Sequence, residues 1–316
     1  MTAPTDTHRP VPTMNAVQVD AWGNANQLRL RRIPRPSPGP GEVLIRISNA
    51  SVNAVDKRVR EGYMDGRLPL PYTAGGDFSG VVQEAGEGAD LVPGTAVFGG
   101  LWPTTGAYAE YIVFPAADLA VKPDAVSFEA AAALPVAGLT AQVAVDQADV
   151  QPGQRVLIQG AAGGVGHLAL QLAKLRGAYV IATASAQDLE FVRTLGADEA
   201  LDYRAPDLLE SLHDIDVVID GVSAANIATL YPAMKPGSIA ISLFDQPPPA
   251  PDGVRAEVVA TTAEEFTSQS LRHLMTELVG LVVAGTLQVV VSQTYTLGQA
   301  ALAQEGRKRG KVVIGL

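Results

Sequence analysis

The stretch that decides the fold is RVLIQGAAGGVG, at residues 155–166. Its first five residues favour a buried strand, and the segment 161–166 consists almost entirely of alanine and glycine. The alanine- and leucine-rich run 165–175 then predicts a helix directly after the turn. Small residues let a pyrophosphate approach the backbone, and a helix start offers unpaired N–H groups. The stretch therefore predicts a dinucleotide site, although Ala161 replaces the first glycine of the usual G-x-G-x-x-G pattern; a structural turn without a ligand is the alternative.

Beyond this turn, predicted strands and helices alternate along the chain. That order is typical of an α/β domain with a doubly wound parallel sheet, which we expect to span residues 128–263. The predicted strands are 179–183, 199–202, 217–220, 238–242 and 256–260, and the predicted helices are 187–195 and 225–234.

The segment before the turn, residues 14–127, is rich in short apolar runs separated by proline and glycine. These features predict a barrel-like, partly open β domain. The tail, residues 264–316, is expected to return and complete that domain with a helix, a strand at 287–291, a short helix and a final strand at 311–314. Residues 1–13 are polar and proline-rich, and we expect them to form a disordered extension rather than a signal peptide.

The end of the second strand of the parallel sheet indicates which dinucleotide binds. Enzymes that use NAD usually place an acidic residue there, about 20 residues past the turn, to bind the ribose hydroxyls. Ser185 occupies this place and accepts a 2′-phosphate without charge repulsion, which favours NADPH. Asp188 is compatible with a capping box that begins at Ser185; alternatively, it is an acid close enough to weaken phosphate binding.

Composition excludes several classes of function. The formal charge of −10 disfavours nucleic-acid partners, and the one basic cluster, Arg307 to Arg309 with Lys311, is interpreted as a solvated surface from which one side chain could meet a cofactor phosphate. With no cysteine, thiolate-ligated zinc is excluded, and four histidines make another metal site improbable. We therefore expect no metal, no membrane span and a cytoplasmic protein.

Motifs distributed over the whole chain carry a family resemblance. The sequence resembles the zinc-independent quinone oxidoreductase branch of the medium-chain dehydrogenase/reductase superfamily. The resemblance implies a GroES-like catalytic domain, a Rossmann cofactor domain and a homodimer. The motifs are ASVNAVD at 50–56, GGDFSGVV at 75–82, LPVAGLTA at 134–141, the turn at 161–166, LGAD at 195–198 with DY at 202–203, and RGKVV at 309–313.

The resemblance also implies roles for individual residues toward NADPH. At the nicotinamide end it implies contacts from Asn53, Thr140 and the backbone at Leu243 and Phe244. Asn53 and the Gly76–Asp77 pair stand where the zinc-dependent relatives keep metal ligands. For the rest of the cofactor it implies Ala162, Gly163, Gly164, Val165, Ser185, Tyr203 beside the 2′-phosphate, and Lys311 near the pyrophosphate.

The implied reaction is hydride transfer to a quinone. A conjugated acceptor takes hydride without a metal because conjugation spreads the negative charge. Reduction of an activated C=C bond in an enone or an enoyl thioester is the alternative, and a cofactor-binding protein without turnover is a second alternative. No catalytic acid stands out, and Tyr63, in a loop expected to line the substrate cleft, is the weak candidate.

Overall fold

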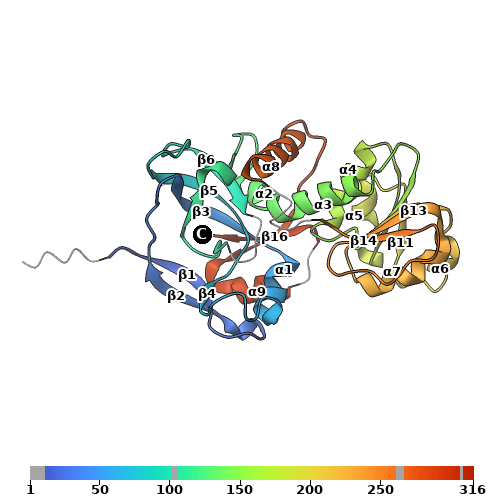
Figure 1. Cartoon of the computed structure of the whole chain (residues 1–316), viewed down its shortest axis with the longest axis horizontal. Helices are drawn as coiled ribbons and strands as arrows, with labels where there is room; N and C mark the ends of the chain where they lie inside the picture. Colours follow the sequence, from blue (N-terminus) through green and yellow to red (C-terminus); the bar gives the residue numbers. More distant parts are fainter. Residues whose placement is uncertain (1–10, 101–104, 261–266, 307–308) are drawn as a thin grey trace, which may run out of the picture.

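The computed structural model describes residues 11–100, 105–260, 267–306 and 309–316. Figure 1 shows antiparallel strands on the left and a sheet flanked by helices on the right. Most of the expected N-terminal extension, residues 1–10, lies outside the described residues, and Thr13 already belongs to the first strand, β1. Within the described ranges, no helix is both long and apolar enough to cross a membrane.

The antiparallel part consists of two sheets. The smaller has the order β2-β1-β4, and the larger has the order β15-β16-β3-β5-β6-β8 with β7 paired to β3. The C-terminal strand β16 pairs with β3, so the tail joins the N-terminal part as expected. The strands are β1 (Thr13–Val19), β2 (Leu28–Pro34), β3 (Glu42–Val52), β4 (Tyr72–Thr73), β5 (Asp77–Ala85), β6 (Ala96–Gly100), β7 (Tyr111–Pro115), β8 (Ala120–Val121), β15 (Val291–Thr296) and β16 (Lys311–Gly315).

The other part is a six-stranded sheet with the order β11-β10-β9-β12-β13-β14, and every pairing in it is parallel. This arrangement confirms the α/β class and the Rossmann-like sheet. Its strands are β9 (Arg155–Gln159), β10 (Tyr179–Ala184), β11 (Glu199–Asp202), β12 (Ile215–Asp220), β13 (Met234–Ser242) and β14 (Arg255–Val258).

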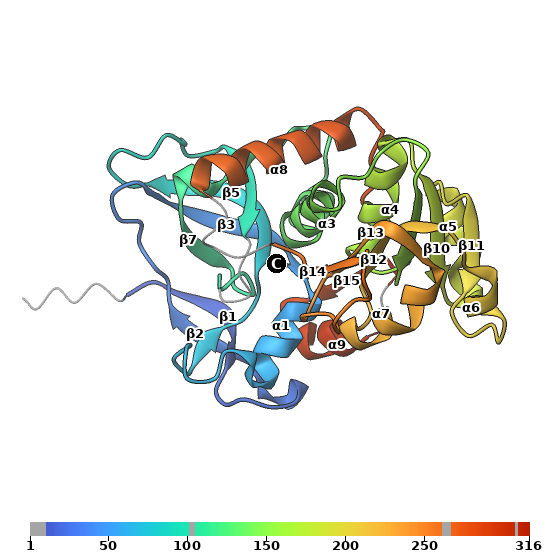
Figure 2. The same cartoon turned by 45° about the vertical axis from the view of Figure 1, so that its right-hand side comes forward.

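Helices cover both faces of the parallel sheet, and strand β9 shows why. Its side chains alternate, so that Val156 and Ile158 pack in the largest apolar cluster while Leu157 packs in the cluster on the opposite face. In Figure 2 helix α8 runs along the top, from the antiparallel part toward α4. The helices are α1 (Ala54–Arg58), α2 (Phe128–Ala132), α3 (Pro135–Gln147), α4 (Gly166–Leu175), α5 (Leu189–Thr194), α6 (Leu208–Ser211), α7 (Ala224–Leu230), α8 (Ser268–Val283) and α9 (Ala300–Glu305), with a π-helical turn η2 (Val59–Tyr63).

One predicted strand is wrong. The apolar run 287–291 resembles a strand, but β15 begins only at Val291. Leu287 is instead buried in the core cluster that includes the α4 leucines, and the backbone of Gln288 bonds the side chain of Gln171 on α4. The run is apolar because it packs against a helix, and periodicity alone does not separate that case from a strand.

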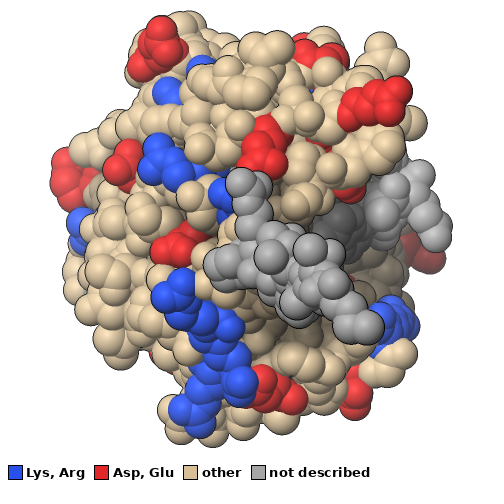
Figure 3. Space-filling view, turned by 90° about the vertical axis from the view of Figure 1, so that its left-hand side faces the viewer, with Lys and Arg blue, Asp and Glu red and all other residues tan. Residues whose placement is uncertain are grey.

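The edge strand β2 carries three exposed arginines, Arg29, Arg31 and Arg32. Arg31 pairs with Asp20 at 2.5 Å, and Arg32 donates to the hydroxyl of Thr13. On the face drawn in Figure 3, Lys and Arg form one band, with acidic side chains next to it. Charged side chains on an edge strand discourage pairing with another chain, which accounts for these arginines.

Candidate cofactor and acceptor site

The glycine turn follows β9 and opens α4. Gly160 has a φ of +69°, a region that favours glycine, and its carbonyl accepts the N–H of Gly163 at 2.9 Å. A Cβ on Gly166 would lie 2.3 Å from the Gly160 oxygen, so the turn closes only with glycine there. The N–H groups of Gly164 and Val165 have no backbone acceptor within the described ranges. Free N–H groups before a helix suit an anion.

Two cavities meet at this turn and share Gly160, Gly163 and Gly221. The larger, of about 600 Å³, lies along the ends of β9 and β10, and the smaller, of about 150 Å³, lies between the turn and the antiparallel part. Of the predicted cofactor residues, the larger cavity is lined by Ala162, Gly163, Ser185 and Tyr203, and the smaller by Asn53, Gly163, Gly164, Val165, Leu243, Phe244 and Lys311.

Two predicted residues lie elsewhere. Thr140 is half-buried on α3 and lines neither cavity, whereas Ala137, one helical turn earlier, lines the smaller one. Tyr63 is 57% exposed at the end of η2, and the guanidinium of Arg58 lies 4.8 Å from its ring centre. The Tyr63 ring thus packs against a cation at the mouth of the site.

A third cavity, of about 650 Å³, continues outward from the smaller one and shares Ala54 and Phe244 with it. Arg58 on α1 pairs with Asp245, which follows β13, at 2.8 Å. This ion pair joins the antiparallel part to the parallel sheet at the lining of the third cavity. An acceptor reaching the smaller cavity from this side passes the Arg58–Asp245 pair.

The carboxylate of Asp188, near the expected position of the 2′-phosphate, has hydrogen-bonding partners. Ser185 makes no side-chain capping bond, so the predicted capping box is wrong. Instead its hydroxyl donates to one oxygen of Asp188 at 2.7 Å, and the Nε of Arg309 donates to the other at 2.7 Å. Of the basic cluster, Arg309 contacts Asp188 at the lining of the larger cavity and Lys311 lines the smaller one, while Arg307 and Lys308 lie outside the described residues.

The residues at the other end of the site form a buried polar network. The Nζ of Lys311 donates to the Oδ1 of Asn53 at 2.5 Å, and the Nδ2 of Asn53 donates to Asp77 at 2.8 Å. Burial raises the pKa of Asp77 to about 7, although Lys311 and Asn53 lower it. Burial likewise lowers the pKa of Lys311, opposed by the negative charges of Asp77 and Asp56.

Asp56 completes a capping box with Asn53 at the start of α1. Its carboxylate accepts the backbone N–H of Asn53 at 2.8 Å and the hydroxyl of Tyr108 at 3.1 Å. Burial and the nearby Asp56 raise the pKa of Tyr108 well above its usual value. The carboxylate therefore fixes the backbone of Asn53 at the start of α1.

The backbone N–H groups that follow β13 already form hydrogen bonds within the protein. The N–H of Leu243 donates to the carbonyl of Asp220 at 2.9 Å, and that of Phe244 lies 3.4 Å from the Ser242 hydroxyl. Both residues line the smaller cavity. The Leu243 N–H is thus already used inside the fold, which leaves the carbonyls and side chains of this segment to face a ligand.

The ring of His167 hydrogen-bonds the backbone of the glycine turn. It is fully buried on α4, with Nδ1 3.0 Å from the carbonyl of Gly163 and Nε2 3.3 Å from the N–H of Val290. A neutral ring that donates from Nδ1 and accepts at Nε2 satisfies both contacts. Burial lowers the pKa of His167 to about 4, consistent with a neutral linker rather than a proton donor.

This depressed pKa predicts that His167 destabilises the fold in acid. Between its ordinary pKa near 6.5 and the folded-state value near 4, the unfolded chain binds a proton at His167 that the folded chain does not. The contribution of His167 to the free energy of unfolding should therefore decrease by about 2 to 3 kcal/mol as pH falls from 7 to 4.5, while the raised pKa of Asp77 contributes with the opposite sign in both proteins compared below. Urea unfolding at both pH values measures the change. His167→Gln cannot titrate and should lose this part of the dependence; equal dependence in the two proteins would contradict the assignment.

The sequence reasoning missed Ala137 and the link from Asn53 to Lys311 and Asp77. Ala137 lies in the LPVAGLTA motif at 134–141. Only its position three residues before Thr140 on the same helix could have indicated that it lines the cavity. Gln159, the last residue of β9, also lines the larger cavity, and its Oε1 is buried with no hydrogen-bond partner. An unpartnered acceptor at the wall of this cavity suits a bound hydroxyl, such as that of a ribose.

These features fit a dinucleotide. The turn supplies free N–H groups, glycine keeps the approach open, and the two joined cavities offer space on both sides of the turn. No group of three or more His, Cys, Asp or Glu side chains in the described ranges could hold a metal ion.

Comparisons with known proteins agree with this site. A family model described as Alcohol dehydrogenase GroES-like domain matches residues 39–124, and one described as Zinc-binding dehydrogenase matches residues 195–314. The chain is 32% identical to the chloroplastic quinone-oxidoreductase QR1 of Triphysaria versicolor, covering 95% of this chain and 98% of the relative.

Solved structures resemble the chain over nearly its full length. The quinone oxidoreductase from Coxiella burnetii superposes with a TM-score of 0.86 at 31% identity, covering 96% of this chain and 100% of that one. A solved NAD-dependent alcohol dehydrogenase superposes with a TM-score of 0.84 at 32% identity, covering 96% of this chain and 100% of that one. The likeness therefore extends over the antiparallel part and the parallel sheet alike.

Proposed function

The chain belongs to the medium-chain dehydrogenase/reductase superfamily as a quinone oxidoreductase-like member, and on that premise we propose that it oxidises NADPH and reduces a quinone without a metal ion. It is an oxidoreductase with a nicotinamide cofactor. The observation that carries the choice of NADPH is the paired state of Asp188. Its carboxylate is bound by Arg309 and Ser185, so its charge is compensated where a 2′-phosphate would lie.

In this proposal the site is divided between the two ends of the cofactor. Ser185 and Tyr203 line the larger cavity and would receive the adenosine 2′-phosphate, and the turn at 163–165 would bind the pyrophosphate. The smaller cavity would take the nicotinamide, which supplies a hydride when bound. Asn53 would orient that end, and the side chains of Leu243 and Phe244 would exclude water from it.

The sequence supports a reaction without metal. The chain has no cysteine, and in the buried cluster near the small cavity the one carboxylate, Asp77, lies with Asn53 and the ammonium of Lys311 rather than with further metal ligands. A quinone or an enone spreads the charge of the incoming hydride by conjugation. The acceptor would enter through the third cavity, whose charged residues, Lys57, Arg58, Glu61, Asp245 and Glu305, include both signs.

We extend the proposal to the organisation of the chain. Residues 14–127 with 264–316 would form the catalytic domain and residues 128–263 the cofactor domain, in a cytoplasmic homodimer. Light scattering on the purified protein tests the dimer, and a mass of about 33 kDa in solution, that of one chain, would contradict it.

The decisive experiment follows cofactor oxidation by purified protein with a panel of quinones, enones and enoyl thioesters. We expect turnover with NADPH and a quinone, and slower turnover with NADH. Equal rates with NADH would contradict the cofactor preference, and turnover of enones alone would favour reduction of C=C bonds. Tight NADPH binding with no oxidation by any acceptor would leave only a binding protein.

The Arg309–Asp188 pair gives a sharper prediction about the cofactor. Arg309→Ala removes a positive charge from the Asp188 carboxylate beside the expected 2′-phosphate, and the dissociation constant for NADPH should rise about tenfold. The constant for NADH, which lacks that phosphate, should stay within about twofold. Fluorescence titration measures both constants.

The double variant Arg309→Ala, Asp188→Asn removes both charges and serves as the control. It should recover most of the NADPH affinity, because no carboxylate then opposes the phosphate. If the single variant loses NADH and NADPH affinity equally, the pair acts on the fold of the turn and not on phosphate selection.

A further inference from the structure

A buried ammonium group lies at the wall of the smaller cavity. Lys311, the first residue of β16, is 2% exposed, and its stem lies against the glycine turn, 3.1 Å from where a Cβ on Gly164 would be. Its Nζ donates to the Oδ1 of Asn53 at 2.5 Å. Burying an ammonium group costs desolvation free energy unless hydrogen bonds or an opposite charge compensate for it. The Asn53 oxygen supplies one such hydrogen bond.

A buried carboxylate lies on the other side of Asn53. Asp77, the first residue of β5, has no exposed surface and accepts the Nδ2 of Asn53 at 2.8 Å. Its second oxygen accepts the backbone N–H of Val136 at 3.1 Å. The carboxylate is therefore held in place by a neighbour that does not depend on Asn53.

The two charges fix the orientation of the Asn53 amide. An ammonium group only donates hydrogen bonds, so it requires the oxygen of the amide, while the Asp77 oxygen accepts from the NH2 group. Rotating the amide by 180° would point the NH2 group at the ammonium and the oxygen at the carboxylate. Both hydrogen bonds would be lost and both contacts would become repulsive, so only one orientation is stable.

The amide oxygen also faces the backbone N–H of Asp56 in a capping box, so beyond these contacts the amide keeps one N–H. Asn53 lines the smaller cavity together with Leu243 and Phe244, so that N–H is available to a ligand there. Asp77 does not line this cavity. Asp77 therefore acts on a ligand only through its hydrogen bond with Asn53. Lys311 can also act on a ligand through Asn53.

We propose that Lys311 and Asp77 are positioning residues that lock the Asn53 amide in the orientation that receives the nicotinamide end of NADPH. This inference rests on the proposed function, which puts the nicotinamide in the smaller cavity. It adds that the affinity contributed by Asn53 depends on charges at two sequence-distant residues.

Binding of NADPH, followed by fluorescence titration, tests the proposal without any turnover. Lys311→Met keeps the stem against Gly164 but removes the charge, and the dissociation constant should rise about tenfold. Lys311→Arg can still donate to the Asn53 oxygen and should stay within about threefold of the wild type. Lys174→Met removes an equally paired lysine, bound to Asp198 outside the cavities, and should change nothing.

A double-mutant cycle separates positioning from a direct contact. Asn53→Ala should also weaken NADPH binding about tenfold, and the combined variant Asn53→Ala, Lys311→Met should be no weaker than Asn53→Ala alone within about twofold. If the two substitutions multiply their effects on the dissociation constant in the combined variant, the proposal is overturned, because Lys311 would then contact the cofactor without Asn53. Thermal unfolding of each variant shows whether any loss is a loss of fold; if Lys311→Met does not fold, failure of Lys311→Arg to bind within threefold overturns the proposal.

Asp77→Asn adds a second test with its own expectation. An asparagine has one acceptor oxygen, so it can accept from Asn53 Nδ2 or from the Val136 N–H but not from both, and without the negative charge the Asn53 amide is held less firmly. The dissociation constant should rise, but by less than in Lys311→Met, about threefold. An unchanged constant would remove Asp77 from the proposal. If wild-type protein does not bind NADPH at all, the proposed function fails; if it binds and the cycle is multiplicative, only this inference fails.

Discussion

Gly166→Ala is expected to weaken NADPH binding at least about 100-fold and to lower the free energy of unfolding by about 2 to 3 kcal/mol. The added Cβ would lie 2.3 Å from the carbonyl oxygen of Gly160 and 2.8 Å from the Cα of Ala161. Both are backbone atoms, so no side-chain rotation relieves the overlap. The turn must open, and the free N–H groups of Gly164 and Val165 would then lose their common direction.

Gly280→Ala is the matched control for this change. Gly280 lies inside α8, and a Cβ there would meet no atom within 4 Å. Alanine has a higher helix propensity than glycine, so this variant should be as stable as the wild type or up to about 1 kcal/mol more stable. Isothermal calorimetry with NADPH and urea unfolding measure both variants. Wild-type affinity in Gly166→Ala would show that the turn does not hold the cofactor.

The fold was predictable because its signals are local. The strand, turn and helix at residues 155–175 and the regular alternation after them depend on neighbouring residues, and the parallel sheet confirms them. The run at 287–290 was mispredicted since its partner, α4, lies more than 100 residues away in the sequence. An apolar run indicates burial, but the element that buries it is set by the tertiary fold.

The site was predictable in its outline and not in its pairings. The turn, Ser185 and Tyr203 follow from the position of the strand ends, and they line one cavity. The contacts of Lys311 with Asn53 and of Arg309 with Asp188 join residues 258 and 121 positions apart. No spacing rule connects such residues, because they meet only where the C-terminal segment passes the glycine turn and pairs with β3. The sequence showed polar or charged residues at these four positions but not which of them pair.

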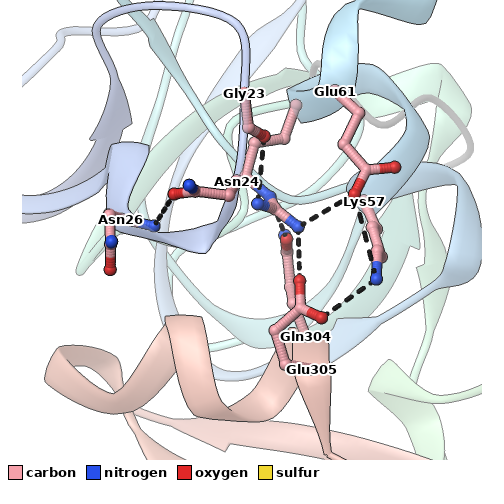
Figure 4. Close-up of polar contacts among 8 residues, drawn as sticks. Gly23, Asn24, Asn26, Lys57, Glu61, Gln304 and Glu305 are labelled. Atoms are coloured by element: carbon pink, nitrogen blue, oxygen red, sulfur yellow. Dashed lines mark hydrogen bonds and ion pairs between the residues drawn. The ribbon is translucent and has the colours of Figure 1, made fainter.

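Arg60→Ala is expected to lower the free energy of unfolding by about 3 to 5 kcal/mol. The Arg60 side chain has no exposed surface, and its three nitrogens each donate a hydrogen bond. The acceptors lie on different elements: the Gly23 carbonyl in the loop after β1, and the side chains of Gln304 and Glu305 at the end of α9. Figure 4 shows these acceptors together with Lys57, whose ammonium bonds Glu305 at 2.9 Å.

Removing the guanidinium would leave a cavity and strand the buried Gln304 oxygen and the half-buried Gly23 carbonyl. It would also detach η2 from α9, and η2 ends at Tyr63, whose ring packs against Arg58 in the lining of the third cavity. Urea unfolding measures the loss of stability. Because Glu305 is 42% exposed and can be solvated, the loss should come from packing and from the two stranded acceptors more than from an unpaired charge.

Two variants separate these contributions. Arg60→Met refills the volume without the hydrogen bonds and should recover part of the stability, about 1 to 2 kcal/mol relative to Arg60→Ala. Arg58→Ala, two residues away, removes an arginine whose partner Asp245 is 62% exposed, and it should cost less than about 1 kcal/mol. If Arg60→Ala and Arg58→Ala were equally mild, the buried hydrogen bonds of Arg60 would not hold the acceptor side of the molecule together. Comparable losses in Arg60→Met and Arg60→Ala would instead assign the whole effect to the hydrogen bonds.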